Sequence, residues 1–236
     1  MRKLTHDEIS KNRSTIDTVH KVKKLPVYVL LNSIRSSYNV GSIFRTSDGA
    51  MIENLILCGY TPHPPLPINL QNTKSVISSE LSSEKSLYSN KSQDSSSRLS
   101  REFRMTTQTG NKDVLKTALG STESVKWEYI KNPLEAIKEI SAKGIKICAL
   151  ELTENSRPYY NLTKNDFPLC LVVGNEITGI SQELLDLCDY SIEIPQYGIK
   201  QSLNVAVAYG IAIFELRKIF DSVGIDLPID PKIKKT

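Results

Sequence analysis

The sequence predicts an α/β fold in which a mostly parallel sheet is covered by helices on both faces. Two observations favour this class. Short apolar runs typical of strands alternate along the chain with segments whose composition and apolar spacing are typical of helices. The 236 residues, 39% of them hydrophobic, are enough to bury one substantial core. We therefore expect one main domain, over residues 26–225, in which strands and helices alternate.

The chain is expected to begin with an accessory element before the sheet starts. Residues 5–24 combine helix-forming and charged residues with a sparse apolar stripe at Ile9, Ile16 and Val19. This pattern predicts an exposed or docked helix within an N-terminal segment, residues 1–25.

The remaining elements are justified by apolar runs and by the breakers between them. In order they are a strand at 27–31, a helix from near Asn39, a strand at 54–58, a helix at 113–119, a strand at 125–129, a helix from Pro133, strands at 145–150 and 169–174, a short helix at 181–188, a strand at 190–194 and a long helix from about Ser202 to Phe220. The last helix is apolar on all sides, so we expect it to be buried.

Two segments are not expected to join the core. From about residue 68 to residue 110 the chain is rich in serine and poor in apolar residues, which predicts a mobile insertion. Residues 226–236 form a basic C-terminal tail.

Composition narrows the function classes without choosing one. The formal net charge of +4 and the pI near 8.7 permit RNA binding but do not demand it. Basic residues gather at both ends of the chain, where they could contact phosphates or simply keep the protein soluble. No stretch is long enough for a transmembrane helix and the N-terminus lacks a secretory apolar core, so we expect a cytoplasmic protein.

The cysteines and histidines lack the spacing of a metal or redox site. The four cysteines are far apart and mostly lie inside apolar runs, as buried thiols in a reducing compartment do. The three histidines are scattered, so we expect neither a metal centre nor a histidine-based triad.

The first chemically informative segment is NVGSIFRT, at residues 39–46. Asn39 is expected to cap a helix, and Gly41 to allow a tight turn. Arg45 should lie nearly two helical turns after Asn39, close to the same face. Alone the segment is weak, because an arginine on an amphipathic helix is usually solvated or salt-bridged.

The second segment, LVVGNEITGIS, ends an apolar strand at Gly174 and continues through Asn175 and Glu176 to Gly179. Ligands of open α/β sheets bind beyond the carboxyl ends of strands, where glycines let backbone amides approach. The segment is neither a GxGxxG fingerprint nor a phosphate loop.

The third segment is IPQYGIKQSLNVAVA, in which Pro195 and Gly198 interrupt the chain after a strand. Ser202 is expected to cap the long helix, and Asn204 to be a buried polar residue at its start. A polar group in that position, beside a loop that contains glycine, suits a small-ligand site.

Together and in this order, the three segments closely resemble the motifs of the SpoU/TrmH branch of the SPOUT methyltransferases. The resemblance runs from about Val27 to Phe220 and is interrupted by the insertion. It implies a C-terminal deep trefoil knot, a homodimer, S-adenosylmethionine as cofactor, and 2′-O-methylation of a ribose in tRNA or rRNA. Gln196 and Ala206 stand where many members have methionine and serine, departures that bear on substrate details.

The resemblance also implies roles for individual residues. The catalytic set would be Asn39, Arg45, Glu176, Ser202 and Asn204. The cofactor-binding set would be Val173, Gly174, Asn175, Glu176, Gly179, Ile194, Pro195, Gly198, Ser202 and Leu203, with Leu203 near the adenine. A guanidinium almost never gives up its proton, so Arg45 is expected to bind a phosphate and the developing oxyanion rather than to act as a base.

Two alternatives remain open at this point. One is a relative that keeps the fold and binds RNA or cofactor without turnover. The other is a nucleotide-binding oxidoreductase, which the missing early glycine fingerprint disfavours.

Overall fold

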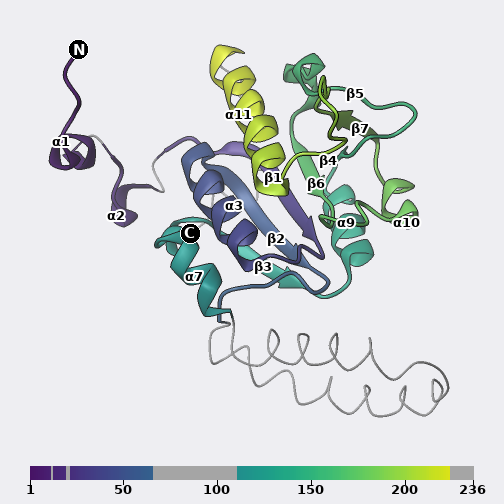
Figure 1. The fold of residues 1–236 in the computed structure, drawn as a ribbon, viewed down its shortest axis with the longest axis horizontal. Coiled ribbons are helices and arrows are strands. Elements are labelled where there is room, and N and C mark those ends of the chain that lie inside the picture. The colour runs from purple at the N-terminus through teal and green to yellow at the C-terminus, as the bar shows by residue number, and fades with distance from the viewer. Residues whose placement is uncertain (12, 20–21, 66–110, 224–236) are drawn as a thin grey trace, which may run out of the picture.

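The computed structural model describes residues 1–11, 13–19, 22–65 and 111–223 (Figure 1). The strands are β1 (Leu25–Asn32), β2 (Ile52–Cys58), β3 (Trp127–Ile130), β4 (Lys146–Leu150), β5 (Arg157–Pro158), β6 (Leu169–Val173) and β7 (Tyr190–Glu193). The α-helices are α1 (His6–Lys11), α2 (Ile16–Val19), α3 (Ser37–Ala50), α7 (Lys112–Ala118), α8 (Ser121–Ser124), α9 (Pro133–Ser141), α10 (Gln182–Leu185) and α11 (Val205–Val223). The 3₁₀ helices η2 (Tyr159–Asn161) and η3 (Lys164–Asp166) lie between β5 and β6.

The described strands form one sheet in the order β3-β2-β1-β6-β4-β7-β5, and every neighbouring pair is parallel. The predicted mostly parallel sheet is thereby confirmed. Val173 of β6 pairs with both Leu31 of β1 and Leu150 of β4, and Leu150 also pairs with Ile192 of β7. The carboxyl ends of these four strands therefore meet at one edge of the sheet.

Helices cover both faces of the sheet, as predicted (Figure 1). One apolar cluster joins α3, α7 and α11 to strand residues such as Leu31 and Val173. A second cluster joins α9 and α10 to the alternate strand residues, among them Leu30 and Val172. Because successive side chains of a strand point to opposite faces, burial on both sides explains why these strands are apolar throughout.

The start of α3 differs from the prediction in two respects. Ser36, not Asn39, is the N-cap, and its hydroxyl accepts a hydrogen bond from the Asn39 amide at 3.3 Å. Asn39 therefore lies in the first turn, with its side chain available for other partners. Gly41 does not form a turn but lies inside the helix, where a Cβ atom would collide with the Thr117 side chain of α7. Its role is the close packing of α3 on α7.

The start and the burial of α11 also correct the prediction. The helix begins at Val205 rather than at Ser202, and the Asn204 side chain accepts a hydrogen bond from the Ala206 amide at 3.0 Å. Asn204 is exposed, because it precedes the buried part of the helix. The helix is not buried on all sides, since Val207 is 52% exposed and Phe214 50% exposed. A face of α11 is therefore left uncovered in the single chain.

The N-terminal segment contains two short helices, α1 and α2, where one helix was expected over residues 5–24. After them the chain contacts the end of α11, because Arg217 Nη1 donates to the Lys23 carbonyl at 3.4 Å and the Lys23 ammonium lies 5.1 Å from the centre of the Phe220 ring. The predicted basic tail, residues 226–236, lies outside the described residues.

A backbone hydrogen bond joins the two sides of the gap between residues 65 and 111. The amide of Asn111 donates to the carbonyl of His63 at 3.0 Å. The Asn111 side chain caps α7 by accepting from the Asp113 amide at 2.9 Å, and it donates to the Ser37 hydroxyl at 2.8 Å. The insertion predicted at about 68–110 lies outside the described residues, yet both of its flanks are attached beside the start of α3.

None of the helices in the described ranges is both long enough and apolar enough to cross a membrane.

Candidate active site

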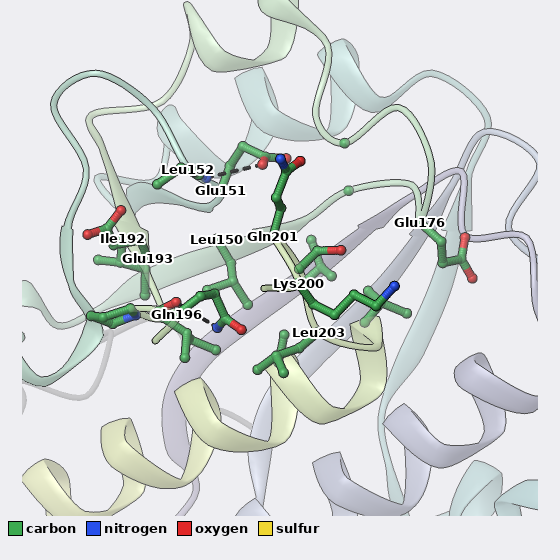
Figure 2. A pocket seen from close by; sticks show the side chains of 18 of the residues that line it. Leu150, Glu151, Leu152, Glu176, Ile192, Glu193, Gln196, Lys200, Gln201 and Leu203 are labelled. Atoms are coloured by element: carbon green, nitrogen blue, oxygen red, sulfur yellow. Dashed lines mark hydrogen bonds between the residues drawn. The ribbon is translucent and has the colours of Figure 1, made fainter. Parts of the chain in front are cut away.

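A pocket of about 650 Å³ opens at the carboxyl ends of β4, β6 and β7. This volume lies within the range of about 300–1,000 Å³ that small-molecule sites occupy. Every residue expected to bind a cofactor lines it, namely Val173, Gly174, Asn175, Glu176, Gly179, Ile194, Pro195, Gly198, Ser202 and Leu203. Figure 2 shows Glu151 and Glu176 well apart around this pocket, with Lys200 between them in that view.

The pocket also contains residues that were not expected to bind a cofactor. Ile199 and Lys200 belong to the third segment, whereas Leu150, Glu151 and Leu152 at the end of β4 lie outside all three segments. The β4 residues were missed because their place in the site depends on the pairing of β4 with β6, which makes both strands end at the same sheet edge. Strand 145–150 was predicted, but its neighbours in the sheet were not.

Gly174 and Gly179 let two backbone segments approach closely at the floor of the pocket. A Cβ atom on Gly174 would lie 2.5 Å from the Gly179 carbonyl carbon and 2.7 Å from the Ile180 nitrogen. Gly179 has a φ of +66°, and a Cβ there would meet Glu151 Oε2 at 2.5 Å. The same carboxylate oxygen accepts a hydrogen bond from the Ile180 amide at 3.0 Å. Both glycines are therefore required by the shape of this loop.

Asn175 is buried, and both its Oδ1 and its Nδ2 have hydrogen-bond partners. Its Oδ1 accepts from the amides of Ile177 at 2.8 Å and Thr178 at 3.0 Å. Its Nδ2 donates to the Ser33 carbonyl at 2.8 Å and to the Tyr60 hydroxyl at 2.6 Å. The side chain thus closes the loop after β6 and attaches it to the segments after β1 and β2.

Glu176 connects the pocket loop to the N-terminus of α3. Its carboxylate accepts from the Arg35 amide at 2.8 Å, from the Ser36 amide at 3.2 Å and from the Asn39 side-chain amide at 2.9 Å. Loss of hydration opposes ionisation, but the hydrogen bonds from Arg35, Asn39 and Ser36 outweigh it, so the pKa of Glu176 is lowered. The positive end of a helix dipole favours the same charged state. Glu176 is therefore ionised at neutral pH.

Asn39 extends this connection to the third segment. Its Oδ1 accepts from the Asn204 side-chain amide at 3.1 Å, while its Nδ2 is the group that donates to Glu176. One asparagine thus links the loop after β6 to the start of α11. Ser202 does not take part in this network, but it lines the pocket two residues earlier. Three predicted residues, Asn39, Glu176 and Asn204, are therefore brought together.

Arg45 lies outside the lining of the pocket, on the exposed surface of α3. It is about 9 Å along the helix axis from Asn39, at 1.5 Å per residue. Its guanidinium makes no hydrogen bond or ion pair with any described residue, and it is thus available to an external anion. Tyr38 and Ser42 are exposed on the same stripe of the helix.

No group of three or more potential ligand side chains in the described part of the chain is arranged to hold a metal ion. The four cysteines are unpaired, and burial raises the pKa of the Cys58 thiol to about 12. Such a thiol stays protonated and is a poor nucleophile.

A family comparison agrees with this geometry. Residues 101–214 match the model described as the SpoU rRNA Methylase family. The chain is thus similar to the SpoU methylase family over 114 of its 236 residues. The matched range contains both pocket loops, those around Gly174 and Pro195, whereas Asn39 and Arg45 precede it.

One curated protein to which the chain is similar is the tRNA (guanosine(18)-2′-O)-methyltransferase of Aquifex aeolicus. It is 40% identical over 100 residues, which make up 40% of this chain and 46% of that protein. The chain therefore spans about half the length of this curated relative.

Solved structures show that the fold is shared over a larger part of the chain. The TrmH/SpoU tRNA modifying enzyme of A. aeolicus superposes with a TM-score of 0.61 at 23% identity, covering 89% of this chain and 84% of that one. The SpoU methyltransferase AviRb from Streptomyces viridochromogenes, crystallised in complex with the cofactor AdoMet, superposes with a TM-score of 0.57 at 20% identity, covering 84% and 58%. These similarities establish the SpoU methyltransferase fold.

Proposed function

We propose that this protein transfers a methyl group from S-adenosylmethionine to the 2′-oxygen of a ribose in tRNA or rRNA. One observation carries the proposal. A small-molecule pocket is connected through Glu176 and Asn39 to the helix that bears Arg45. The family match and the name of the Aquifex relative support the same activity. Catalysis would need alignment of two reactants more than covalent or metal chemistry.

The residues present fit the cofactor. The glycines at 174 and 179 expose backbone at the floor of the pocket, where added Cβ atoms would collide with neighbouring chain. Apolar side chains such as Leu150 and Leu203 line the same cavity and suit an adenine ring. Backbone groups of residues 173–179 and 194–198 would therefore provide most of the recognition.

The residues around the pocket would orient the two reactants. S-adenosylmethionine supplies a methyl group on a sulfonium, which an oxygen nucleophile can attack directly. Glu176 would hold the pocket loop against the start of α3, and Asn204 would fix Asn39 from the other side. Ser202, in the wall of the pocket, would help to position the ribose.

Arg45 would bind an RNA phosphate and stabilise the negative charge that develops on the 2′-oxygen. A guanidinium has five donors and does not deprotonate in proteins, so the proton would pass to phosphate or water. The exposed and unpaired state of Arg45 in the described structure supports this role, because no internal anion competes for it.

Methyl transfer provides the test. Wild-type protein should transfer label from tritiated S-adenosylmethionine to bulk tRNA or rRNA, and the absence of label on every RNA would favour the inactive relative. Arg45→Ala and Arg45→Lys should lower the rate at saturating RNA and cofactor by about 10²-fold or more. Ser42→Ala, on the same exposed face of α3, is the matched control. Full activity in both Arg45 variants would refute the assignment.

We further propose a homodimer that covers the exposed apolar face of α11 and the last turn of α3 beside it, and that leaves Arg45 accessible to RNA. Val207 and Phe214 leave an apolar surface exposed in the single chain. Gly49 of α3 lies next to the Phe214 ring, because a Cβ atom added to this glycine would be 3.6 Å from Phe214 Cζ. Large exposed apolar surfaces mark interaction sites. Sedimentation equilibrium should give twice the chain mass of 26.4 kDa, and a particle of a single chain mass would contradict the proposal.

The trefoil knot is part of the same proposal. The loops after β6 and β7 border one pocket, and the chain after β7 reaches Asn39 through Asn204, which are the proximities that such threading requires. An experimental chain trace from β7 to α11 that passes outside the loop at 174–180 would contradict it.

A further inference from the structure

An exposed tyrosine stands on a rigid turn beside the site. Tyr60 follows β2 and is 43% exposed. The next residue, Thr61, is buried, and its hydroxyl accepts from the Ile34 amide at 3.0 Å and donates to the Cys58 carbonyl at 2.7 Å. The turn is thereby attached to the segment after β1. The backbone that carries the Tyr60 ring is held in place, although the side chain faces solvent.

The Tyr60 side chain is itself anchored at its far end. Its hydroxyl accepts the hydrogen bond from Asn175 Nδ2 at 2.6 Å. Asn175 also lines the pocket, so the ring is attached to the rim of the site that holds the methyl donor in our proposal. An aromatic side chain fixed in this way loses little conformational freedom when another ring stacks on it.

The backbone of Arg35 lies beside the turn that carries Tyr60. The Ile34 amide, which precedes Arg35, donates to the Thr61 hydroxyl, which follows Tyr60, at 3.0 Å. The Arg35 amide itself donates to Glu176 at 2.8 Å, so its backbone position is fixed. The Arg35 side chain is exposed and makes no hydrogen bond or ion pair with a described residue. The neighbouring Glu176 carboxylate is already satisfied by three donors. Arg35 is therefore free to bind an external anion.

We infer that Tyr60 and Arg35 form a subsite for a nucleotide that flanks the methylated ribose, with its base stacked on Tyr60 and its phosphate bound by Arg35. A fixed aromatic ring beside a free guanidinium is the combination that recognises unpaired bases in single-stranded RNA. The inference rests on the proposed function for its substrate class. Asn175 and Glu176, which bind Tyr60 and the Arg35 amide, also line the pocket, so the occupant of the subsite would be a near neighbour of the target nucleotide.

The test measures RNA binding, independently of methyl transfer. The probe is a short single-stranded RNA of mixed sequence labelled with fluorescein, and the readout is fluorescence anisotropy over a range of salt concentrations. Tyr60→Leu should weaken binding about ten-fold, whereas Tyr60→Phe keeps the stacking surface, loses only the anchor to Asn175, and should be weakened less than Tyr60→Leu. Arg35→Gln should reduce the slope of log K against log salt by about 0.7, the effect of one phosphate contact on a single strand.

Two controls match these changes elsewhere on the surface. Tyr160→Leu removes an exposed tyrosine that does not line the pocket, and Lys143→Gln removes a positive charge before β4, at the opposite edge of the sheet. Both should bind RNA as wild type does. The inference is overturned if Tyr60→Leu binds with wild-type affinity, if Tyr160→Leu is weakened equally, or if Arg35→Gln leaves the salt slope unchanged.

The outcome is separable from that of the proposed function. Affinity for S-adenosylhomocysteine is measured by calorimetry on the same samples. In Tyr60→Leu the fold-loss of RNA affinity must exceed the fold-loss of S-adenosylhomocysteine affinity. If the melting curve of Tyr60→Leu shows that this variant does not fold, the slope of log K against log salt in Arg35→Gln still tests the subsite. Wild-type protein that binds RNA through the subsite without transferring methyl groups would refute the proposed function but support the subsite.

Discussion

Gly174→Ala is expected to damage both the stability and the pocket of this protein. The new Cβ atom would lie 2.5 Å from the Gly179 carbonyl carbon, whereas real Cβ contacts are essentially never under 3.0 Å. The loop after β6 must therefore move by about half an ångström or more, against the hydrogen bond that joins Ile180 to Glu151. Overpacking of this kind costs about 2 kcal/mol, which lowers the Tm by about 6 °C in a domain of this size.

Two assays measure the effect. Thermal unfolding by circular dichroism gives the change in Tm, and calorimetry with S-adenosylhomocysteine gives the change in affinity, expected to be about ten-fold if one hydrogen bond to the loop is lost. Gly198→Ala is the matched control for stability, because an added Cβ there meets no protein atom within 4 Å. Wild-type Tm and affinity in Gly174→Ala, or an equal loss of Tm in Gly198→Ala, would refute the reasoning.

Three further changes test other contacts. Because hydrogen bonds lower the pKa of Glu176 below its ordinary 4.5, its stabilisation is complete above that pH and is lost as the pH falls through the lower folded value. Glu176→Gln should therefore be less stable than wild type by about 1 kcal/mol at neutral pH, with a gap that closes in acid; chemical denaturation at several pH values checks this. Asn204→Ala removes the cap of α11 and the contact with Asn39, so it should cost about 1 kcal/mol and weaken binding of S-adenosylhomocysteine, whereas unchanged melting and affinity would count against both roles. Tyr209→Phe leaves the buried Ser47 hydroxyl without its partner at 2.7 Å and should cost about 1–3 kcal/mol, most of which the double variant with Ser47→Ala should recover in the same denaturation assay.

The sheet and the pocket loops could be predicted because their signals are local. An apolar run such as 169–173 followed by Gly174 indicates a buried strand and a close approach without knowledge of its neighbours. Glu151 could not be recognised in this way. The pairing of β4 with β6 brings the Glu151 carboxylate to the Ile180 amide. The order of strands in a sheet cannot be predicted from any single segment.

Helix starts were misplaced for a different physical reason. Ser36 and Asn39 are both good capping residues, and so are Ser202 and Asn204. Where two candidates lie within one turn, tertiary contacts choose between them. In α3 the Glu176 carboxylate binds the Asn39 side chain and thereby removes it from capping. In α11 the cap is Asn204, which also donates to Asn39.

The hydrogen bond between the Asn111 amide and the His63 carbonyl has a consequence for evolution and engineering. The bond holds residues 63 and 111 together. The free energy of closing a flexible loop inserted between two such fixed ends grows only logarithmically with its length, by about 0.6 kcal/mol for each doubling. We expect that segments of very different size can be exchanged at this junction while the sheet and the pocket keep their geometry. The junction is thus a natural place to shorten the chain for crystallisation, or to graft a reporter domain beside the start of α3.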